Sequence, residues 1–387
     1  MSKVKKILIV ISVVCILLGG AIMTGALVTL QQHASEEIAA MEFHQTTQRI
    51  TEDFSDIVIN TQNSSIEILP SSNGTCRIVC DDHEKIFHTV SLQNTGDGSV
   101  LYITQHNEWQ WYDIFGGIHW QDDPVLTIYL PKDAYGVVDL FSSSGDITVA
   151  PDFSFRTLST YSVSGNTKLS DLKSDNLNIR SISGDISVHI AEVAEDVYLG
   201  NVSGFTRAEH VNSNQLTVNT SSGNTALEYI TSAYLHSSAV SGQIIVYDSI
   251  LQDTSHFETS SGSIEISDSE CGEQTIQGIS GSVKLQNVRG TSLNARTTSS
   301  YIFIGEALYN GNVLCNTSSG GISFTGLDAE KLEFLTSSGD VSGNLLSGKN
   351  FVTETSSGHV DVPPSDQTAG TCHISTVSGN VSIVIEP

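Results

Sequence analysis

The chain has 387 residues, with 43 Asp and Glu against 17 Lys and Arg, so its formal net charge is −26. So acidic a protein lacks the basic surface that nucleic-acid binding requires, which excludes nucleic acid as a partner. Six cysteines are too few for a disulfide scaffold, and a hydrophobic content of 39% fits a folded chain rather than a disordered one.

The N-terminus carries a predicted membrane anchor. Residues 7–30 are apolar and uncharged, long enough for a single transmembrane helix. Three lysines in residues 1–6 precede this stretch and two glutamates follow it, so the positive-inside rule predicts a cytoplasmic tail and an extracellular C-terminal domain held at the cell membrane. A cleaved signal peptide is the alternative. The polar residues 31–48 are expected to form a short stalk.

Irregular β structure is predicted over residues 49–135. This region contains strand-like runs, IVIN at 57–60, SIEIL at 65–69 and VLTIYLP at 125–131, but it does not share the repeat period of the residues that follow. The first coil in a stack of β-coils would expose a sheet edge. We therefore expect this region to cap the membrane-proximal end of the stack.

The densest group of metal-ligand residue types in the chain lies in this cap region. It consists of His83 and His88 with Asp81, Asp82 and Glu84. Their spacing matches no standard metal site, so we expect a solvated loop, with no metal and no cofactor.

The cysteines are predicted to be unpaired. Cys76 and Cys80 would share one face of a strand but lie about 13 Å apart, too far for a disulfide with each other. Cys315 and Cys372 fall at apolar positions of the repeat and are expected in the core. Cys271 falls in a connection and has no assigned role.

An aromatic cluster in residues 106–124 supplies the candidate binding residues. Trp109, Trp111 and Trp120 are all the tryptophans of the chain, and Tyr112 lies among them. Two adjacent glycines between them favour a hairpin. In one interpretation the rings plug the end of the β-stack; in the other they form an exposed tip that binds glycan, a partner protein or the bilayer interface.

A repeat occupies residues 136–387. The dipeptide Ser-Gly recurs with a mean period of about 19.5 residues, and we count thirteen repeats by placing Tyr301 at the one position that lacks the glycine. The residue before this position is serine in every repeat. The glycines are Gly145, Gly165, Gly184, Gly204, Gly223, Gly242, Gly262, Gly281, Gly320, Gly339, Gly358 and Gly379.

Apolar residues recur at fixed distances from each glycine and alternate with polar ones, which is the periodicity of strands. Because equivalent positions stay apolar from repeat to repeat, they are expected to stack in one interior. Ile264 and Val283 should stack in this way, whereas Ser263 should face outward. The pattern predicts an all-β protein whose main domain is a parallel β-solenoid of about thirteen 19–20-residue coils.

The Ser-Gly position is predicted to be a corner of each coil. Glycine would supply the backbone angles of a tight corner, and the stacked serine hydroxyls would bond the backbone of the adjacent coil. Asp146, Asp185 and Asp340 follow the glycine in three repeats and are expected to form turns, with a structural cation as the alternative. A serine present in every coil is not a nucleophile, so no catalytic residue is assigned.

Four segments resemble a known family. These are SSGDITV at 143–149, SISGDISV at 181–188, TSSGDV at 336–341 and the lead-in LTIYLPKDAY at 126–135. They are similar to the DUF4097 family of bacterial envelope proteins with β-strand repeats, whose adhesin label is itself inferred. The resemblance implies an envelope-associated β-solenoid with no established catalytic activity, and some relatives are linked to envelope stress responses.

We therefore predict a non-enzymatic, membrane-anchored extracellular β-solenoid, an adhesin or envelope scaffold. Its partner would be a cell-envelope or host-surface component, protein or glycan, with end-to-end self-association through the C-terminal coil as a further contact. One alternative is an envelope-stress component that binds cationic antimicrobial peptides, favoured by the acidic charge. A polysaccharide-active β-helix enzyme is the other, although no known catalytic motif is present.

Overall fold

The computed structural model describes residues 43–83, 85–96, 98–108 and 124–386. Every regular element in these ranges is a β-strand, and the strands form one continuous hydrogen-bonded network. The expected transmembrane helix at 7–30 and most of the expected stalk lie outside the described residues. Within the described part of the chain, no helix has the length and apolar character to cross a membrane.

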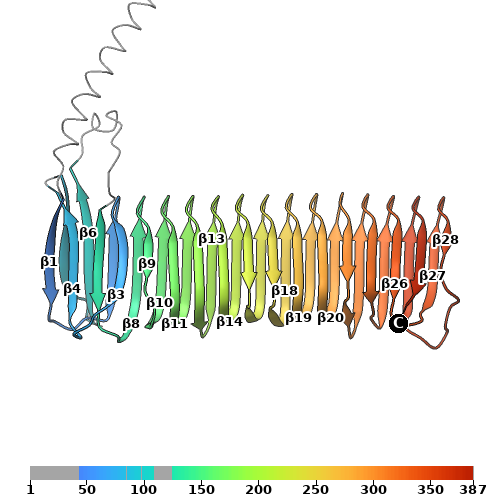
Figure 1. Cartoon of the computed structure of the whole chain (residues 1–387), viewed down its shortest axis with the longest axis horizontal. Coiled ribbons are helices and arrows are strands. Elements are labelled where there is room, and N and C mark those ends of the chain that lie inside the picture. The colour runs from blue at the N-terminus through green and yellow to red at the C-terminus, as the bar shows by residue number, and fades with distance from the viewer. Residues whose placement is uncertain (1–42, 84, 97, 109–123, 387) are drawn as a thin grey trace, which may run out of the picture.

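The strands stack along one axis into an elongated rod with an irregular cap at its N-terminal end (Figure 1). The cap and first coil contain β1 (His44–Ile50), β2 (Asp56–Thr61), β3 (Ser65–Pro70), β4 (Cys76–Asp82), β5 (Ile86–Asn94), β6 (Ser99–Asn107) and β7 (Val125–Leu130).

The rod contains β8 (Ala134–Ser142), β9 (Ile147–Val149), β10 (Phe153–Ser162), β11 (Thr167–Ser181), β12 (Ile186–Val193), β13 (Asp196–Asn201), β14 (Thr206–Thr220), β15 (Thr225–Glu228), β16 (Thr231–Ala239), β17 (Ile244–Tyr247), β18 (Ile250–Thr259), β19 (Ile264–Gly278), β20 (Val283–Thr297), β21 (Ile302–Gly305), β22 (Leu308–Tyr309), β23 (Asn312–Thr317), β24 (Ile322–Leu327), β25 (Lys331–Thr336), β26 (Val341–Leu345), β27 (Asn350–Thr355), β28 (Val360–Asp361), β29 (Thr371–Thr376) and β30 (Val381–Ile385).

Parallel pairing between successive coils, interrupted by a few register shifts, confirms the predicted β-solenoid, but with about twelve turns instead of the thirteen coils expected. In the pair β19–β20, Ile264 lies opposite Val283, and both side chains are fully buried. Ser263, one residue earlier, is half-buried at the surface. The alternation of apolar and polar residues along each strand therefore sets which face enters the core, and stacking extends that core along the rod.

The glycine of each corner is required for a reason other than the expected backbone angles. These glycines do not adopt positive φ angles. Instead, consecutive corners approach so closely that a Cβ on Gly281 would lie 1.5 Å from the carbonyl oxygen of Gly262, and one on Gly242 would lie 1.8 Å from that of Gly223. Glycine is therefore needed for backbone-to-backbone contact between coils, not for its backbone angles.

Positive φ angles occur instead at a second corner, several residues after the glycine, in a column with no common residue type in the sequence. Most of the residues there are not glycine, although non-glycine residues seldom adopt this conformation. The column consists of Asp152, Asp171, Ile190, His210, Tyr229, Asp248, Asp268, Asn287 and Glu306, followed by Gly326.

Side chains at the Ser-Gly corner join adjacent coils. Asp146 Oδ1 accepts a hydrogen bond from the backbone N–H of Asn166 at 2.7 Å, and Asn166 Oδ1 accepts one from Asp185 N–H at 2.9 Å. The Ser203 hydroxyl donates to the backbone carbonyl of Ile182 in the preceding coil, as expected for the stacked serines. The Asp and Asn residues thus satisfy backbone groups of the next coil, which accounts for them without a cation.

For the coil that lacks the corner glycine, the register predicted from the sequence is wrong by one residue. A Cβ on Gly320 would lie 1.7 Å from the carbonyl oxygen of Ser300, so Ser300 occupies the glycine position and Tyr301 does not. Accordingly Ile302, two residues after Ser300, is fully buried, and Tyr301 is 52% exposed.

One coil of the stack lies inside the region interpreted as irregular. β2 pairs in parallel with β8, and β3 pairs with β9. Ser64, between β2 and β3, lies under Gly145 in the column of corner residues. The regular stack therefore begins before residue 136, while residues 44–48 of the expected stalk belong to β1, which pairs antiparallel with β4.

The coils at the far end do not follow chain order. β29 pairs with β25 on one side and with β27 on the other, and β30 lies between β26 and β28. Figure 1 places β27 and β28 at the end of the rod, with the C-terminus inward of them. The expectation that the C-terminal coil forms the end surface is therefore wrong, because that coil is inserted between two earlier ones.

The segment that crosses over the inserted coil is held by a buried lysine. Lys349 Nζ donates hydrogen bonds to Asp328 Oδ1 at 2.6 Å, to the Ala329 carbonyl at 2.8 Å and to Ser347 Oγ at 2.9 Å. Lys349 is only 5% exposed, and its three partners satisfy all three ammonium protons. This lysine fixes the connection to the outermost coil.

Candidate functional site

The binding residues predicted from the sequence, Trp109, Trp111, Tyr112 and Trp120, lie outside the described residues. The choice between a plug and an exposed tip therefore stays a prediction. The described chain contains two other groups of side chains with binding chemistry: one on the outer face of the rod, the other inside the cap.

The first group is an aromatic strip on the outer face of β8, β10, β11 and β13. Phe141 and Tyr161 stack with ring centroids 5.5 Å apart and planes at 7°. On the next two strands, the guanidinium of Arg180 lies over the ring of Tyr198, 5.0 Å from its centroid. Parallel strands in constant register place these outward positions side by side, so residues about 20 apart in sequence form one surface. We call Phe141, Tyr161, Arg180 and Tyr198 the aromatic strip.

Two shallow hollows flank Tyr161 and Arg180. One, of about 390 Å³, is also lined by Asp139 and Asn178, and the other, of about 410 Å³, by Tyr198. Asn178 Oδ1 accepts a hydrogen bond from Arg180 Nε at 3.3 Å and so helps to orient the guanidinium. Flat rings beside amide, carboxylate and guanidinium groups suit a ligand that has both apolar faces and many hydroxyls or amides.

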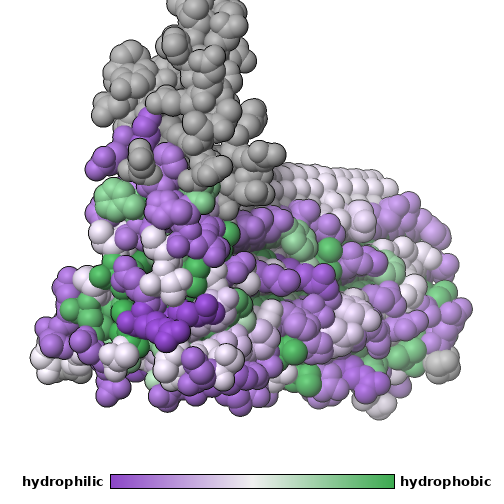
Figure 2. Space-filling view, turned by 60° about the vertical axis from the view of Figure 1, so that its left-hand side comes forward, coloured by the Kyte–Doolittle hydropathy of each residue, from purple (hydrophilic) through white to green (hydrophobic). Residues whose placement is uncertain are grey.

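Outside the aromatic strip, too, the surface combines polar and apolar side chains. In the view of Figure 2, hydrophilic and hydrophobic side chains are interspersed over the cap and along the rod, and no broad hydrophobic face stands out. A second aromatic ladder follows the corner with positive φ angles, where the rings of His210 and Tyr229 stack 4.5 Å apart. Tyr229 is 41% exposed and lies away from the aromatic strip.

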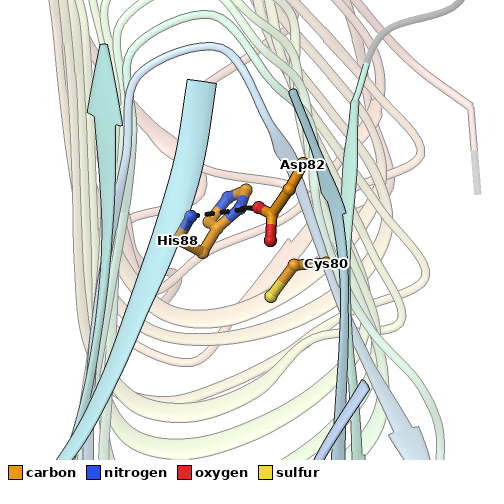
Figure 3. A group of neighbouring side chains, drawn as sticks. All are labelled: Cys80, Asp82 and His88. Carbon is orange, nitrogen blue, oxygen red and sulfur yellow. Dashed lines mark hydrogen bonds and ion pairs between the residues drawn. The ribbon is translucent and has the colours of Figure 1, made fainter. Parts of the chain in front are cut away.

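The second group lies in the cap, where Cys80, Asp82 and His88 meet (Figure 3). Cys80 and Asp82 are two residues apart on β4 and point to the same inner side, and His88 enters from β5. His88 Nδ1 is 2.7 Å from Asp82 Oδ1, which also accepts the backbone N–H of His88 at 3.0 Å. The expected solvated loop is therefore wrong for Asp82 and His88, because both residues lie in strands and both side chains are buried.

The other members of the predicted cluster do not join this group. Asp81 points to the opposite side of β4, where its carboxylate accepts hydrogen bonds from Gln45 Nε2 and from the backbone N–H of Val125. His83 is half-buried in the turn before β5, and Glu84 lies outside the described residues. The period of two along a strand explains the split, since alternate residues face opposite sides.

The environment of Cys80 opposes its ionisation. Burial, helped by the negative charge of Asp82, raises the pKa of the Cys80 thiol to about 12, although a hydrogen bond with Thr46 acts in the other direction. Thr46 Oγ1 also donates to Asp82 Oδ2 at 2.5 Å. A buried, protonated thiol is a poor nucleophile, so the proximity of Cys, His and Asp does not make a catalytic triad.

The five cysteines of the described chain are all unpaired and buried. Cys315 and Cys372 are fully buried in the core of the rod, as predicted. Cys271 lies within β19 rather than in a connection, and its sulfur accepts a hydrogen bond from Gln274 Nε2 at 3.0 Å. Of these cysteines, only Cys80 belongs to a group that could hold a metal ion.

Two of the solved structures that are similar to this chain are described as follows. One is described as a candidate adhesin from Bacteroides fragilis, with 13% identity, a TM-score of 0.35, and coverage of 62% of this chain and 97% of that one. The other is described as a candidate cell adhesion protein from Clostridium sporogenes, with 8% identity, a TM-score of 0.25, and coverage of 89% and 100%. No curated protein matches the chain.

The sequence profile of the toastrack family DUF4097 matches residues 54–247, 209–322 and 308–387. These overlapping matches cover the first coil, the whole rod and the inserted C-terminal coil. The matched segments include all four stretches from which the resemblance was inferred. The chain belongs to the DUF4097 (toastrack) family.

Proposed function

We propose that this protein is a non-enzymatic adhesin or envelope scaffold, held at the cell membrane by residues 7–30, with the β-solenoid on the extracellular side. The rod would present its side to a component of the cell envelope or of a host surface. The observation that carries this proposal is the aromatic strip, because stacked, partly exposed rings with an adjacent guanidinium are typical of binding surfaces rather than of a solvated sheet.

A glycan fits the aromatic strip best. Exposed rings such as Tyr161 offer apolar faces to sugar rings, while Arg180, Asn178 and Asp139 offer partners for hydroxyl groups. The hollows are shallow and follow one another across adjacent coils, which suits an extended chain rather than a compact small molecule. A protein partner remains the other outcome of the test.

The non-enzymatic assignment has support from the described residues. The group with the residue types of a catalytic triad, Cys80, His88 and Asp82, is buried and its thiol is protonated. The carboxylates beside the Ser-Gly corner accept hydrogen bonds from neighbouring coils, so they serve the backbone. Incubating the protein with wall polymers and host glycans should release no reducing ends or unsaturated products.

Glycan binding can be tested with a double variant of the aromatic strip. Tyr161→Ser with Tyr198→Ser removes one exposed and one half-buried ring from the outer face, outside the core, so the fold should persist while binding to glycan arrays and whole cells falls at least tenfold. Tyr229→Asn is the matched control, because it removes an exposed ring elsewhere and asparagine tolerates positive φ. Equal binding by the double variant and the unmodified protein would contradict the proposal.

The cationic-peptide alternative rests on the net charge of −26. An acidic extracellular rod would attract cationic antimicrobial peptides through a field that salt screens. Titration of the protein with such a peptide at low and high ionic strength separates the two functions. Peptide binding that is strong at low salt and unaffected by the double variant would favour this alternative over the aromatic strip.

A further inference from the structure

We propose that Cys80, Asp82 and His88 form a binding site for a divalent transition-metal ion of the Zn²⁺ type inside the cap. The three side chains supply sulfur, oxygen and nitrogen, which are the three ligand types that zinc takes in proteins. They come from two strands that are not paired with each other, so a bound ion would cross-link these strands. The proposal is independent of glycan or peptide binding on the rod.

The spacing of the three groups suits a small cation. One ligand atom from each residue can be chosen so that all three lie within 4.8 Å of one another. Tetrahedral zinc, with bonds of about 2.0–2.3 Å, holds its ligand atoms about 3.3–3.8 Å apart. If His88 bound the ion through Nδ1, the metal bond would replace the 2.7 Å hydrogen bond between Nδ1 and Asp82 Oδ1. The His88 and Asp82 side chains would then separate by roughly half an ångström or more.

The burial of the group is the second observation. Cys80, Asp82 and His88 are 2%, 5% and 7% exposed, in an interior that also holds Ile78 and Leu126. Burying a carboxylate and an imidazole among aliphatic side chains is unfavourable unless their polar atoms are satisfied. The chain does not satisfy them all: His88 Nε2 is buried and has no hydrogen-bond partner. A metal ion bound through Nε2 would account for the position of these residues and for the unpartnered nitrogen, whereas one bound through Nδ1 would account for their position alone.

Supporting contacts around the ligands are also present. Asp82 accepts hydrogen bonds from Thr46 Oγ1 on β1 and from the His88 backbone, which fix its carboxylate plane. Such outer contacts orient ligands and raise metal affinity. Three protein ligands would leave the fourth position of a tetrahedral ion to water.

The ion would join two parts of the cap that share few hydrogen bonds. β4 pairs with β1 and β7, whereas β5 pairs with β6, which in turn pairs with β2. Between β4 and β5, the described contacts include a single bridge, His83 with Ile86, at the turn. A cation held by Cys80 and Asp82 on one strand and by His88 on the other would close the cap against local opening.

The test uses the full chain and the metal alone. The protein is stripped with a chelator, dialysed against Zn²⁺ and assayed for bound metal, and thermal melting is recorded with and without Zn²⁺. We expect one tightly bound ion per chain and a higher melting temperature in Zn²⁺. Cys80→Ser and His88→Gln should each lower the affinity at least tenfold and reduce the zinc-dependent melting shift.

Cys76→Ser is the matched control. Cys76 lies on the same face of β4, is buried and unpaired, but has no His or Asp beside it, so its loss should leave metal binding unchanged. Co²⁺ provides a readout that needs no variant, because a thiolate–Co²⁺ bond gives a strong near-ultraviolet absorption that surface carboxylates and imidazoles do not. Two results would overturn the proposal. One is zinc binding by a protein that shows no such absorption when Co²⁺ is bound instead. The other is zinc binding retained by both Cys80→Ser and His88→Gln.

Discussion

The rod and the cap differ in how each uses its side chains. In the rod, nearly every coil repeats the same corner and the same apolar positions, so a residue type that recurs has a structural role, as Gly262 and Gly281 show. In the cap, antiparallel strands depart from the repeat and bring together residues that occur once, such as Cys80 and His88. The repeated coils of the rod present the same side chains along a surface, whereas the irregular cap brings different side chains together at one place.

The strongest way to break the regular rod is to place a charge in its core. Ile264→Asp would bury a carboxylate without a partner between Ile244 and Val283, which should cost several kcal/mol. Ser263→Asp, one residue earlier and at the surface, should be nearly neutral. Thermal melting of the two variants measures the difference. Equal shifts would mean that the register of this coil is wrong by one residue.

A methyl group at the corner should be almost as damaging. Gly281→Ala places a Cβ 1.5 Å from the Gly262 carbonyl oxygen, so the two coils must separate, at a cost of about 3 kcal/mol. Gly348→Ala is the control, since its Cβ would meet only Asp366 at 3.9 Å. Chemical denaturation compares them. If both variants unfold at the same denaturant concentration, close backbone approach is not why glycine recurs.

The irregular far end should depend on one ion pair. Lys349→Met removes three hydrogen bonds from the crossing segment and should destabilise the outermost coil by about 1–2 kcal/mol, leaving the middle of the rod unaffected. Hydrogen exchange should accelerate at the amides of β27 but not at those of β19. Uniform acceleration in both strands would show instead that the rod unfolds as one unit.

Acid should loosen the same end. Burial alone would raise the pKa of Asp328, but hydrogen bonds from Lys349 and Ser347 and the lysine charge outweigh it and hold the pKa below its ordinary value. A carboxyl whose pKa is lower in the folded state stabilises the fold above its unfolded pKa of about 3.9, and this contribution is lost as the pH falls through the folded value. Asp328→Asn should therefore weaken β27 at neutral pH and remove this acid dependence, as hydrogen exchange at pH 7 and in acid can establish.

The smallest effect should be a gain in stability within the rod. The hydroxyl of Thr206 is buried in the core without a hydrogen-bond partner, beside Ile186. Thr206→Val keeps the shape of the side chain and removes the unsatisfied group, which should stabilise the protein by about 1 kcal/mol. Thr336→Val is the contrasting change, since the Thr336 hydroxyl bonds two corner glycines and its loss should destabilise. A lower melting temperature for Thr206→Val would contradict this account.

The local pattern predicted most of the rod because each coil repeats the same environment. The alternation of apolar residues placed Ile264 and Val283 in the core correctly. It failed at Tyr301, where the corner glycine is replaced and a neighbouring serine fits the same space. It also passed over Ser64, because a single coil without glycine carries too little signal to be recognised as a repeat.

The sequence by itself determined the fold class, the period and the inward face of each strand, because a side chain in a parallel stack meets its own equivalents. Only the tertiary structure decided which coils are neighbours. Insertion of β29 between β25 and β27 satisfies the same hydrogen bonds as chain order would, so no local pattern distinguishes the two arrangements. The meeting of Cys80, Asp82 and His88 was hidden for a related reason, since it depends on how β4 and β5 diverge after their turn, and spacing along the chain does not encode that divergence.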